Sequence, residues 1–93
     1  MEKRFYIISY DLKVPGRDYT SLYSVIKDNY DWQHPLESTW LVYSSQDVNS
    51  IYNVIKPNMD NNDLLFICEL KIQNRQGWMS KKCWEWINSK PLL

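Results

Sequence analysis

The segment Phe5–Leu12 constrains the fold more than any other part of the chain. It is rich in aromatic and β-branched residues, and it contains no Pro, no Gly and no charge before Asp11. This composition is typical of a strand and not of a helix. Successive side chains of a strand point to opposite faces, and here both faces are largely apolar. We therefore predict a strand inside a sheet that is covered on both sides.

The composition predicts one small domain with more aromatic side chains than its core needs. A chain of 93 residues forms a single domain, residues 1–93. Its five Trp, seven Tyr and two Phe exceed what a thin two-layer core buries, so we expect some of them at an oligomer interface or at a site that stacks planar ligands. The net charge of zero argues against strong, indiscriminate binding to a long polyanion.

The two cysteines and the hydropathy pattern predict the compartment. Cys68 and Cys83 do not have the CxxC spacing, and no signal peptide precedes them. No apolar run approaches the roughly 20 residues that a membrane-spanning helix needs. We therefore expect a reduced, cytoplasmic protein with packed thiols and no membrane partner.

The rest of the chain alternates between helical and extended patterns. The patterns first predict a helix that is capped by Asp18 and ends near Asn29, and then an edge or bulged strand at Asp31–Leu36. A strand at Ser38–Ser44 follows, and after it a helix that is capped by Ser44 or Ser45 and stopped by Pro57. The last two elements are a strand at Leu64–Lys71, buried on both faces in its first half, and a short helix capped by Ser80.

This order predicts an α+β fold of the ferredoxin-like βαββαβ type with an added C-terminal helix. Such units form a four-stranded antiparallel sheet with two helices on one face, and we expect the first and third long strands in the middle. The other face is then bare, although the strands are apolar on both faces. We therefore expect the chain to associate with itself through the open sheet face.

Four motifs spread over nearly the whole chain form a recognisable set. They are Tyr6-Ile-Ile-Ser-Tyr-Asp-Leu12 with its Pro-Gly loop and the Asp-Tyr-x-x-Leu helix start, Leu36-Glu-Ser-Thr-Trp-Leu-Val42, Asn62-Asp-Leu-Leu65 and Gly77-Trp78. The set resembles a family of small bacterial and phage proteins labelled SinR-like, which is unrelated to the helix-turn-helix regulator of that name. That family is similar in turn to the small CRISPR-associated adaptation subunit and to the virulence-associated D toxins. The resemblance implies a ferredoxin-like fold and a dimer.

The resemblance also implies a catalytic candidate. In the CRISPR-associated relatives an Asp ends the first strand, two such carboxylates approach across the dimer axis, and metal-dependent cleavage of phosphodiesters is assigned to them. Asp11 matches that position. A pair of such carboxylates would suit Mg²⁺, which prefers oxygen ligands. The chain departs from these relatives, because only Lys13 and Arg17 represent their Arg-rich segment and Glu37-Ser-Thr-Trp-Leu replaces their Gln-led second motif.

The polar candidates have plainer interpretations as well. Asp11 caps the turn after its strand, pairs with Arg17, contacts a ligand or acts in catalysis. His34, the one histidine, is structural or at the surface, or it serves as a general acid–base. No Cys/His cluster indicates a zinc site, and a chain with two glycines cannot contain a phosphate-binding P-loop.

The tryptophans and the basic residues near the C-terminus predict a ligand site. Several of the five Trp lie near polar turns, where they either pack over the sheet edge or a dimer partner, or stack on a base. In the second interpretation basic side chains bind phosphate, and strand ends and loops extend the pocket. The candidate ligand-binding residues are Tyr10, Arg17, Ser38, Trp40, Arg75, Trp78, Lys81 and Lys82.

Two functions of different classes follow from these patterns. The first is a non-catalytic, homo-oligomeric binding module for a nucleotide-like small molecule or short RNA, which needs no cofactor; a role in phage defence is consistent with the settings of the SinR-like family. The second is a metal-dependent endoribonuclease that uses Asp11 from two protomers and requires Mg²⁺. A purely structural interaction protein is a third, lesser alternative.

Overall fold

β1 (Arg4–Asp11) is a central strand, as the sequence predicts, and it pairs with antiparallel neighbours on both sides. The computed structural model, which describes residues 2–91, has one sheet with the strand order β2-β3-β1-β4. The other strands are β2 (Asp31–Leu36), β3 (Thr39–Ser44) and β4 (Leu64–Leu70). The predicted ferredoxin-like α+β arrangement is confirmed. The middle strands are β1 and β3, so the expectation that the first and third long strands are central is right for β1 and wrong for β4, which lies at an edge.

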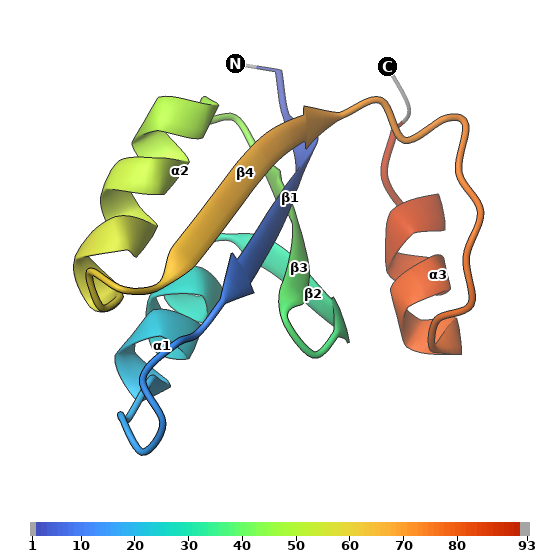
Figure 1. Cartoon of the computed structure of the whole chain (residues 1–93). Helices are drawn as coiled ribbons and strands as arrows, with labels where there is room; N and C mark the ends of the chain where they lie inside the picture. The colour runs from blue at the N-terminus through green and yellow to red at the C-terminus, as the bar shows by residue number, and fades with distance from the viewer. Residues whose placement is uncertain (1, 92–93) are drawn as a thin grey trace.

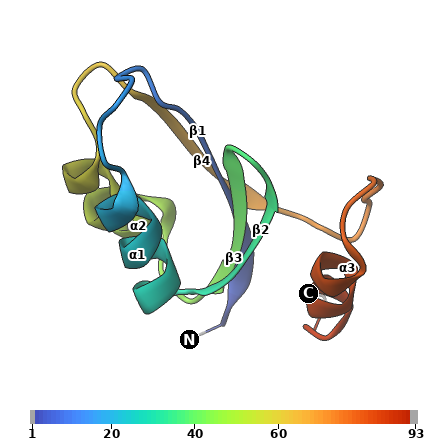
Figure 2. The same ribbon diagram turned by 90° about the horizontal axis from the view of Figure 1, so that it is seen from below.

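Two helices cover one face of the sheet, and a third helix lies against the opposite face (Figures 1 and 2). α1 (Thr20–Asn29) and α2 (Val48–Ile55) lie side by side, and a 3-10 turn, η1 (Lys56–Asn58), follows α2. α3 (Lys81–Asn88) follows a long loop that leaves the end of β4. The sheet is therefore the middle layer of the molecule.

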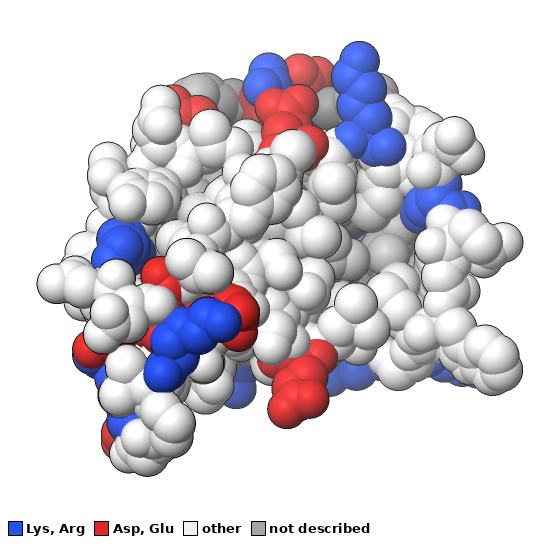
Figure 3. Space-filling model, viewed as in Figure 1, with Lys and Arg blue, Asp and Glu red and all other residues white. Residues whose placement is uncertain are grey.

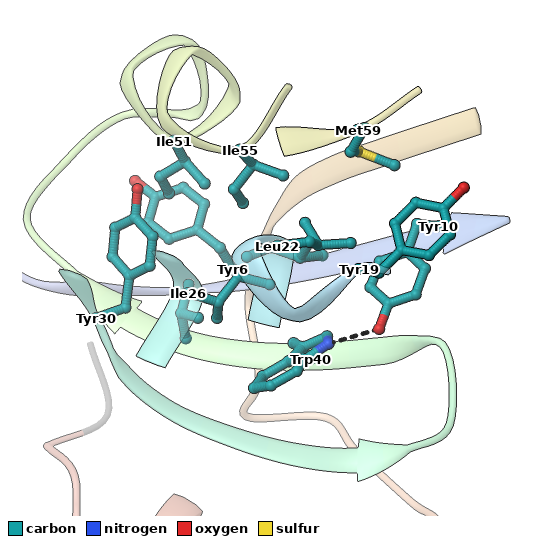
Figure 4. Packing of buried hydrophobic residues seen from close by; sticks show 12 residues of the cluster. Tyr6, Tyr10, Tyr19, Leu22, Ile26, Tyr30, Trp40, Ile51, Ile55 and Met59 are labelled. Carbon is teal, nitrogen blue, oxygen red and sulfur yellow. Dashed lines mark hydrogen bonds between the residues drawn. The ribbon is translucent and has the colours of Figure 1, made fainter. Parts of the chain in front are cut away.

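The main core lies between the sheet and the pair α1 and α2. Each helix buries two residues that lie four positions apart, such as Leu22 and Ile26 of α1, because that spacing places them on the same helix face. Trp40 has no exposed surface, and its indole N–H donates a hydrogen bond of 2.9 Å to the hydroxyl of Tyr10 (Figure 4). A buried N–H needs such an acceptor, so this bond sets how β1 and β3 pack in the core.

α3 closes a second, smaller core on the opposite face. Phe5 and Leu41 of the sheet meet Ile72 and Ile87, and Trp86 lies edge-on to Phe5 with 5.7 Å between the ring centroids. The expectation of a bare face is therefore wrong for this part of the sheet, because the C-terminal helix covers it.

Asp31 anchors α3 to the first residue of β2. Its carboxylate accepts a hydrogen bond of 2.8 Å from the indole N–H of Trp86, and it forms an ion pair with Lys90. Burial opposes ionisation of this carboxylate, but the hydrogen bonds from Lys90 and Trp86 outweigh that effect and lower its pKa. These bonds give α3 a defined position on the sheet beyond what apolar contact alone provides.

Two predicted helix caps differ in the structure. Asp47, and not Ser44 or Ser45, caps α2, because its side chain accepts a hydrogen bond of 2.8 Å from the backbone N–H of Ser50. Asp18 accepts from the backbone N–H of Thr20, but the residue at the N-cap position of α1 is Tyr19. The predicted cap of α3, Ser80, is confirmed by its bond to the N–H of Cys83.

β4 is an edge strand, and its first half is not buried on both faces as the sequence suggested. Leu64 is 60% exposed and Phe66 is 63% exposed, whereas the alternate residues Leu65 and Ile67 pack against the main core. Leu64 and Phe66 point to the face on which α3 lies, and the packing contacts of α3 do not extend to them. Their exposure follows from the limited area that one short helix covers.

Removal of the Tyr10 hydroxyl tests the main core. We expect Tyr10→Phe to lower the free energy of unfolding by roughly 1–3 kcal/mol, because the buried Trp40 N–H loses its acceptor. Chemical denaturation measures this change. Tyr52→Phe removes a hydroxyl from an exposed side chain of α2 and should change stability little. Equal losses in the two variants would contradict a role for the Trp40–Tyr10 hydrogen bond.

Loss of the Asp31 carboxylate tests the attachment of α3. We expect Asp31→Ala to increase amide hydrogen exchange in α3 while exchange in β1 and β3 stays slow, because Trp86 and Lys90 lose their partner. Mass-spectrometric exchange reports each segment separately. Asp28→Ala, which removes an exposed acid from α1, serves as the control. Unchanged exchange in α3 would show that apolar contacts alone hold this helix.

Candidate functional site

The predicted site residues lie in two separate parts of the molecule and in the core. Tyr10, Asp11, Arg17 and Ser38 belong to the end of β1 and to nearby turns, whereas Arg75, Trp78, Lys81 and Lys82 belong to the loop after β4 and to the start of α3; Trp40 lies within β3. Figure 1 shows that the end of β1 lies beside the loop that leads to α1, away from α3. The structure therefore presents two candidate surfaces.

Tyr10 and Trp40 are core residues and do not face a ligand. Tyr10 is buried, Trp40 is completely buried, and each is bound to the other by the hydrogen bond described above. The sequence placed both near the strand end, where a pocket was expected. Their even-numbered positions turn them instead toward α1 and α2, because alternate residues of a strand share a face.

Asp11 lies exposed at the end of β1, on the face opposite α1 and α2. Its carboxylate forms an ion pair of 2.7 Å with Lys13, and not with Arg17 as one interpretation of the sequence predicted. The side chain is 61% exposed, and it borders an open hollow of about 240 Å³. The same hollow is lined by Ser9 and Tyr10 of β1 and by Leu64, Leu65 and Phe66 of β4. An acid here can meet a ligand, but the adjoining surface is mainly apolar.

Arg17 holds two loops together. Its guanidinium lies 3.1 Å from the carboxylate of Asp60, which joins the loop after β1 to the loop before β4. The guanidinium also lies over the ring of Tyr19, at 5.3 Å from the centroid. These contacts give Arg17 a structural role and leave about a third of its side chain exposed.

Asp63 also lies in this region, although it is not among the site residues that the sequence predicts. It is buried, and its carboxylate accepts hydrogen bonds from the backbone N–H of Lys13 at 2.7 Å, the hydroxyl of Tyr19 at 2.9 Å and the backbone N–H of Asp60 at 2.8 Å. Burial opposes ionisation, but these bonds and the nearby Arg17 outweigh it and lower the pKa of Asp63. The sequence signal was an acid directly before an apolar strand, which is also common in ordinary loops.

Ser38 and His34 support the β2–β3 hairpin. The carbonyl of Ser38 accepts a hydrogen bond of 3.1 Å from the N–H of Tyr10, which ties the hairpin turn to β1. The imidazole of His34 stacks on Trp40 with 3.8 Å between centroids and 11° between planes, and its Nε2 lies 3.0 Å from the carbonyl of Glu37. These contacts agree with the structural interpretation of His34.

Arg75 fastens the loop after β4 to α3. Its guanidinium donates to the carbonyl of Ile72 at 3.0 Å and to the side chain of Asn88 at 2.7 Å. Both partners are polar groups of the fold itself, so two of the five N–H donors of the guanidinium are used within the chain.

Trp78, Lys81 and Lys82 form an exposed group at the start of α3. Trp78 is 98% exposed. Gly77, the residue before it, lies close to Trp84, because a Cβ atom built on Gly77 would be 3.7 Å from the Trp84 ring. Lys81 lies 3.7 Å from Glu85, a weak surface pair. Lys82 is exposed, and within residues 2–91 no ion pair occupies it. We call Trp78, Lys81 and Lys82 the Trp78 group.

The other tryptophans contribute to packing. Trp32 lies 5.3 Å from Trp40, and Lys27 lies over its ring at 5.2 Å. Trp84 and Trp86 pack on the smaller core, and Lys90 lies 5.4 Å above the ring of Trp86. Of the five tryptophans, all of which lie within the described residues, only Trp78 has a face that is fully open to a ligand.

The acids of one chain do not converge on a metal site. Within residues 2–91, no group of three or more His, Cys, Asp or Glu side chains is arranged to hold a metal ion. Asp11 lies beside Lys13, and Asp63 spends its oxygens on hydrogen bonds within the fold.

Figure 3 shows how charge is distributed on the β4 side of the molecule. The middle of this face is uncharged, and Lys, Arg, Asp and Glu side chains gather along its margins. Two large apolar residues of β4, Leu64 and Phe66, are exposed. This face is suited to contact an apolar surface and not a polyanion.

Comparison with protein-family models, with curated proteins and with solved structures finds no match for this chain. Among the helices of residues 2–91, none has the length and apolar character required to cross a bilayer.

Asp63 predicts a pH dependence of stability. Because its pKa is lower in the folded chain than the value near 4 of the unfolded chain, Asp63 stabilises the fold above about pH 4, and this contribution is lost as the pH falls through the folded pKa. We expect Asp63→Asn to cost roughly 1–3 kcal/mol at pH 7 and to flatten the acid side of the stability profile. Denaturant titrations from neutral to acidic pH measure both effects.

Asp28→Asn is the matched control, because it removes the same charge from an exposed position of α1. It should leave the profile close to that of the wild type. A profile for Asp63→Asn that stays parallel to the wild type throughout the acid range would show that other carboxylates cause the dependence.

Proposed function

We propose that this protein is a non-catalytic, homo-oligomeric binding module for a short RNA or a nucleotide-like small molecule. The Trp78 group carries the proposal, because it combines a 98% exposed indole with the neighbouring ammonium groups of Lys81 and Lys82. An aromatic face stacks on a base regardless of its sequence, and a lysine binds phosphate as a point charge. The pairing of these two chemistries favours a nucleotide over an uncharged apolar ligand.

The charge of the whole chain favours a short ligand. The 11 basic residues are balanced by 11 acidic ones, and five of the basic side chains form ion pairs within the fold. Long polyanions are bound by a basic surface that neutralises many phosphates. A small local group suits one or a few nucleotides, and a role in phage defence through such a ligand is part of this proposal.

A second candidate is the metal-dependent endoribonuclease, and the exposure of Asp11 favours it. The carboxylate is open to solvent at the end of a central strand and borders the hollow next to β4. Its ion pair with Lys13 and the surrounding apolar side chains count against this candidate, because phosphodiester cleavage needs several polar groups around the metal.

A binding titration tests the first proposal. We expect a labelled single-stranded RNA of about 8 nucleotides to bind the wild type, and Trp78→Ala to weaken binding by about tenfold, since stacking contributes about 1–3 kcal/mol per base. Lys82→Ala should weaken binding less and reduce its salt dependence. Fluorescence anisotropy and quenching of tryptophan emission provide independent measurements of the complex.

Lys27→Ala is the matched control, because Lys27 lies on α1, across the sheet from α3. If this variant loses as much affinity as Lys82→Ala, binding is diffuse electrostatic attraction and the assignment to the Trp78 group is wrong. The same RNA incubated with Mg²⁺ or Mn²⁺ tests the nuclease. We expect it to stay intact, whereas cleavage that disappears in Asp11→Ala would replace the binding module with the endoribonuclease.

A further inference from the structure

The outer edge of β4 lacks the features that normally keep an edge strand from pairing with another chain. β4 is the last strand in the order β2-β3-β1-β4, and in Figure 1 no helix or loop passes in front of it. It contains no Pro, and its pairing with β1 is regular along its whole length. Its one charged residue, Glu69, is paired with Arg4 at 3.1 Å. Such a regular, apolar edge is a template for a further strand.

The opposite edge of the same sheet is protected. β2 contains Pro35, which has no N–H to donate, and its register with β3 shifts between Gln33 and Leu36. α3 is also fastened to β2 through Asp31 and through the thiol of Cys83, which lies 3.6 Å from the side-chain oxygen of Gln33. Three features therefore hinder the pairing of a further strand with β2, namely Pro35, the register shift and the attachment of α3, and none of them is present at β4.

The side chains beside the open edge are large and apolar. Leu64 and Phe66 stay more than half exposed although they belong to the core-forming sheet, and they border the hollow of about 240 Å³ next to Asp11. Cys68 and Leu70 continue the same row on the same face, because they alternate with residues of the main core. A second copy of this strand at the edge would place its own apolar row beside this one, so that the two rows pack against each other.

We infer that two copies of this chain pair through β4, antiparallel and about a two-fold axis at Ile67, so that their sheets join into one. Ile67 is the midpoint of β4, which spans Leu64–Leu70, so this register uses the whole strand. It places each Phe66 opposite Cys68 of the other copy, and each Leu64 opposite Leu70. The inference rests on the homo-oligomeric part of the proposed function and names the surface that forms the oligomer.

Charge at the strand ends favours this register and identifies a second copy as the partner. An axis at Ile67 places Lys71 of one copy opposite position 63 of the other, where Asp63 lies. The carboxylate of Asp63 is buried and accepts three hydrogen bonds within its own chain, so Lys71 would act on it as a nearby opposite charge and not as a direct hydrogen-bond donor. An axis at Phe66 would place Glu69 opposite Asp63, a repulsive pair. The strand is therefore complementary to itself at both ends in one register.

Edge pairing also agrees with the position of α3 better than face-to-face stacking does. α3 projects from the face to which Leu64 and Phe66 point, so it hinders the approach of a second sheet to that face (Figure 2). It does not project past the edge at β4. The partner strand approaches in the plane of the sheet, which α3 leaves open.

This arrangement has a consequence for Asp11. Asp11 pairs with Leu64 at one end of β4, and in the antiparallel dimer the second Asp11 lies level with the first copy's Leu70. Six residues of strand separate the two positions by about 20 Å. Two carboxylates at that distance cannot share one metal ion, so edge pairing is incompatible with a nuclease built from both copies of Asp11.

Sedimentation equilibrium of the full chain tests the pairing. A one-strand interface is small beside the roughly 1,200–2,000 Å² of stable complexes, so we expect a dimer with a dissociation constant on the order of micromolar. Phe66→Lys places a natural edge-blocking residue on the strand and should raise that constant at least about tenfold. Lys71→Glu should raise it as well, because it places two acids opposite each other.

Leu36→Lys is the matched control, since Leu36 is 54% exposed on the protected edge strand β2. It should leave the dissociation constant unchanged, and far-ultraviolet circular dichroism verifies that each variant keeps its fold. A wild type that stays monomeric at about 100 μM overturns the inference, because edge pairing of this kind binds at micromolar concentration. Equal weakening by Leu36→Lys and Phe66→Lys overturns it as well.

Cross-linking determines the register. In Phe66→Cys, mild oxidation should join position 66 of one copy to Cys68 of the other, because opposite side chains in an antiparallel pair have Cβ atoms about 4.5–5.5 Å apart. Leu64→Cys has no cysteine opposite it and should cross-link far less. Peptide mapping that finds another pair, or equal cross-linking in both variants, overturns the register at Ile67.

The oligomer and the RNA are measured separately, so their failures are distinguishable. A dimer that binds no oligonucleotide supports edge pairing and contradicts the proposed ligand. A monomer that binds oligonucleotide overturns edge pairing and leaves the ligand assignment standing.

Discussion

The structure depends on the need to cover both faces of β1. Phe5 and Ile7 point to one side of this strand, and Tyr6, Ile8 and Tyr10 point to the other, so water must be excluded on both sides. On one side α1 and α2 provide a complete layer, and Trp40 and Ile8 are fully buried there. On the other side the chain has one short helix, α3, which covers the start of β1 and the neighbouring part of β3. Because α3 does not extend over the first half of β4, apolar side chains of β4 such as Leu64 and Phe66 stay exposed on this side of the sheet.

Polar groups in this protein serve mainly to position its apolar layers. Asp63 joins the loops on either side of the sheet end, and Asp31 holds α3 on β2. In both cases hydrogen bonds to the ionised carboxylate outweigh the cost of burial, so the pKa falls and the charge is kept. Arg17 and Arg75 are used in the same way. These charged groups therefore contribute to the folded structure by joining its loops and helices.

The candidate ligand surface and the candidate dimer edge are physically different. The Trp78 group is a compact, exposed combination of an indole and ammonium groups at the start of α3, which suits a planar anionic ligand. The edge of β4 is extended and largely apolar, and it offers unpaired backbone groups, which suits another strand. Pairing through β4 leaves the Trp78 group of each copy exposed, because Trp78 lies outside the paired strand. The two surfaces can therefore act at the same time, and one dimer would present two ligand groups.

The sequence by itself determined the elements and their order, because alternation and four-residue spacing are local properties. The β1 strand, the α1 boundary near Asn29, the irregular β2 and the cap at Ser80 all follow from neighbouring residues. Only the tertiary structure decided which side chains meet. In the folded chain Tyr10 is buried against Trp40, and Asp11 pairs with Lys13. Asp63 accepts hydrogen bonds from three donors, and Phe66 is exposed at the edge of the sheet. The physical reason is that burial and pairing depend on residues far apart in the sequence, such as Lys13 and Asp63, which are 50 positions apart and which no local pattern relates.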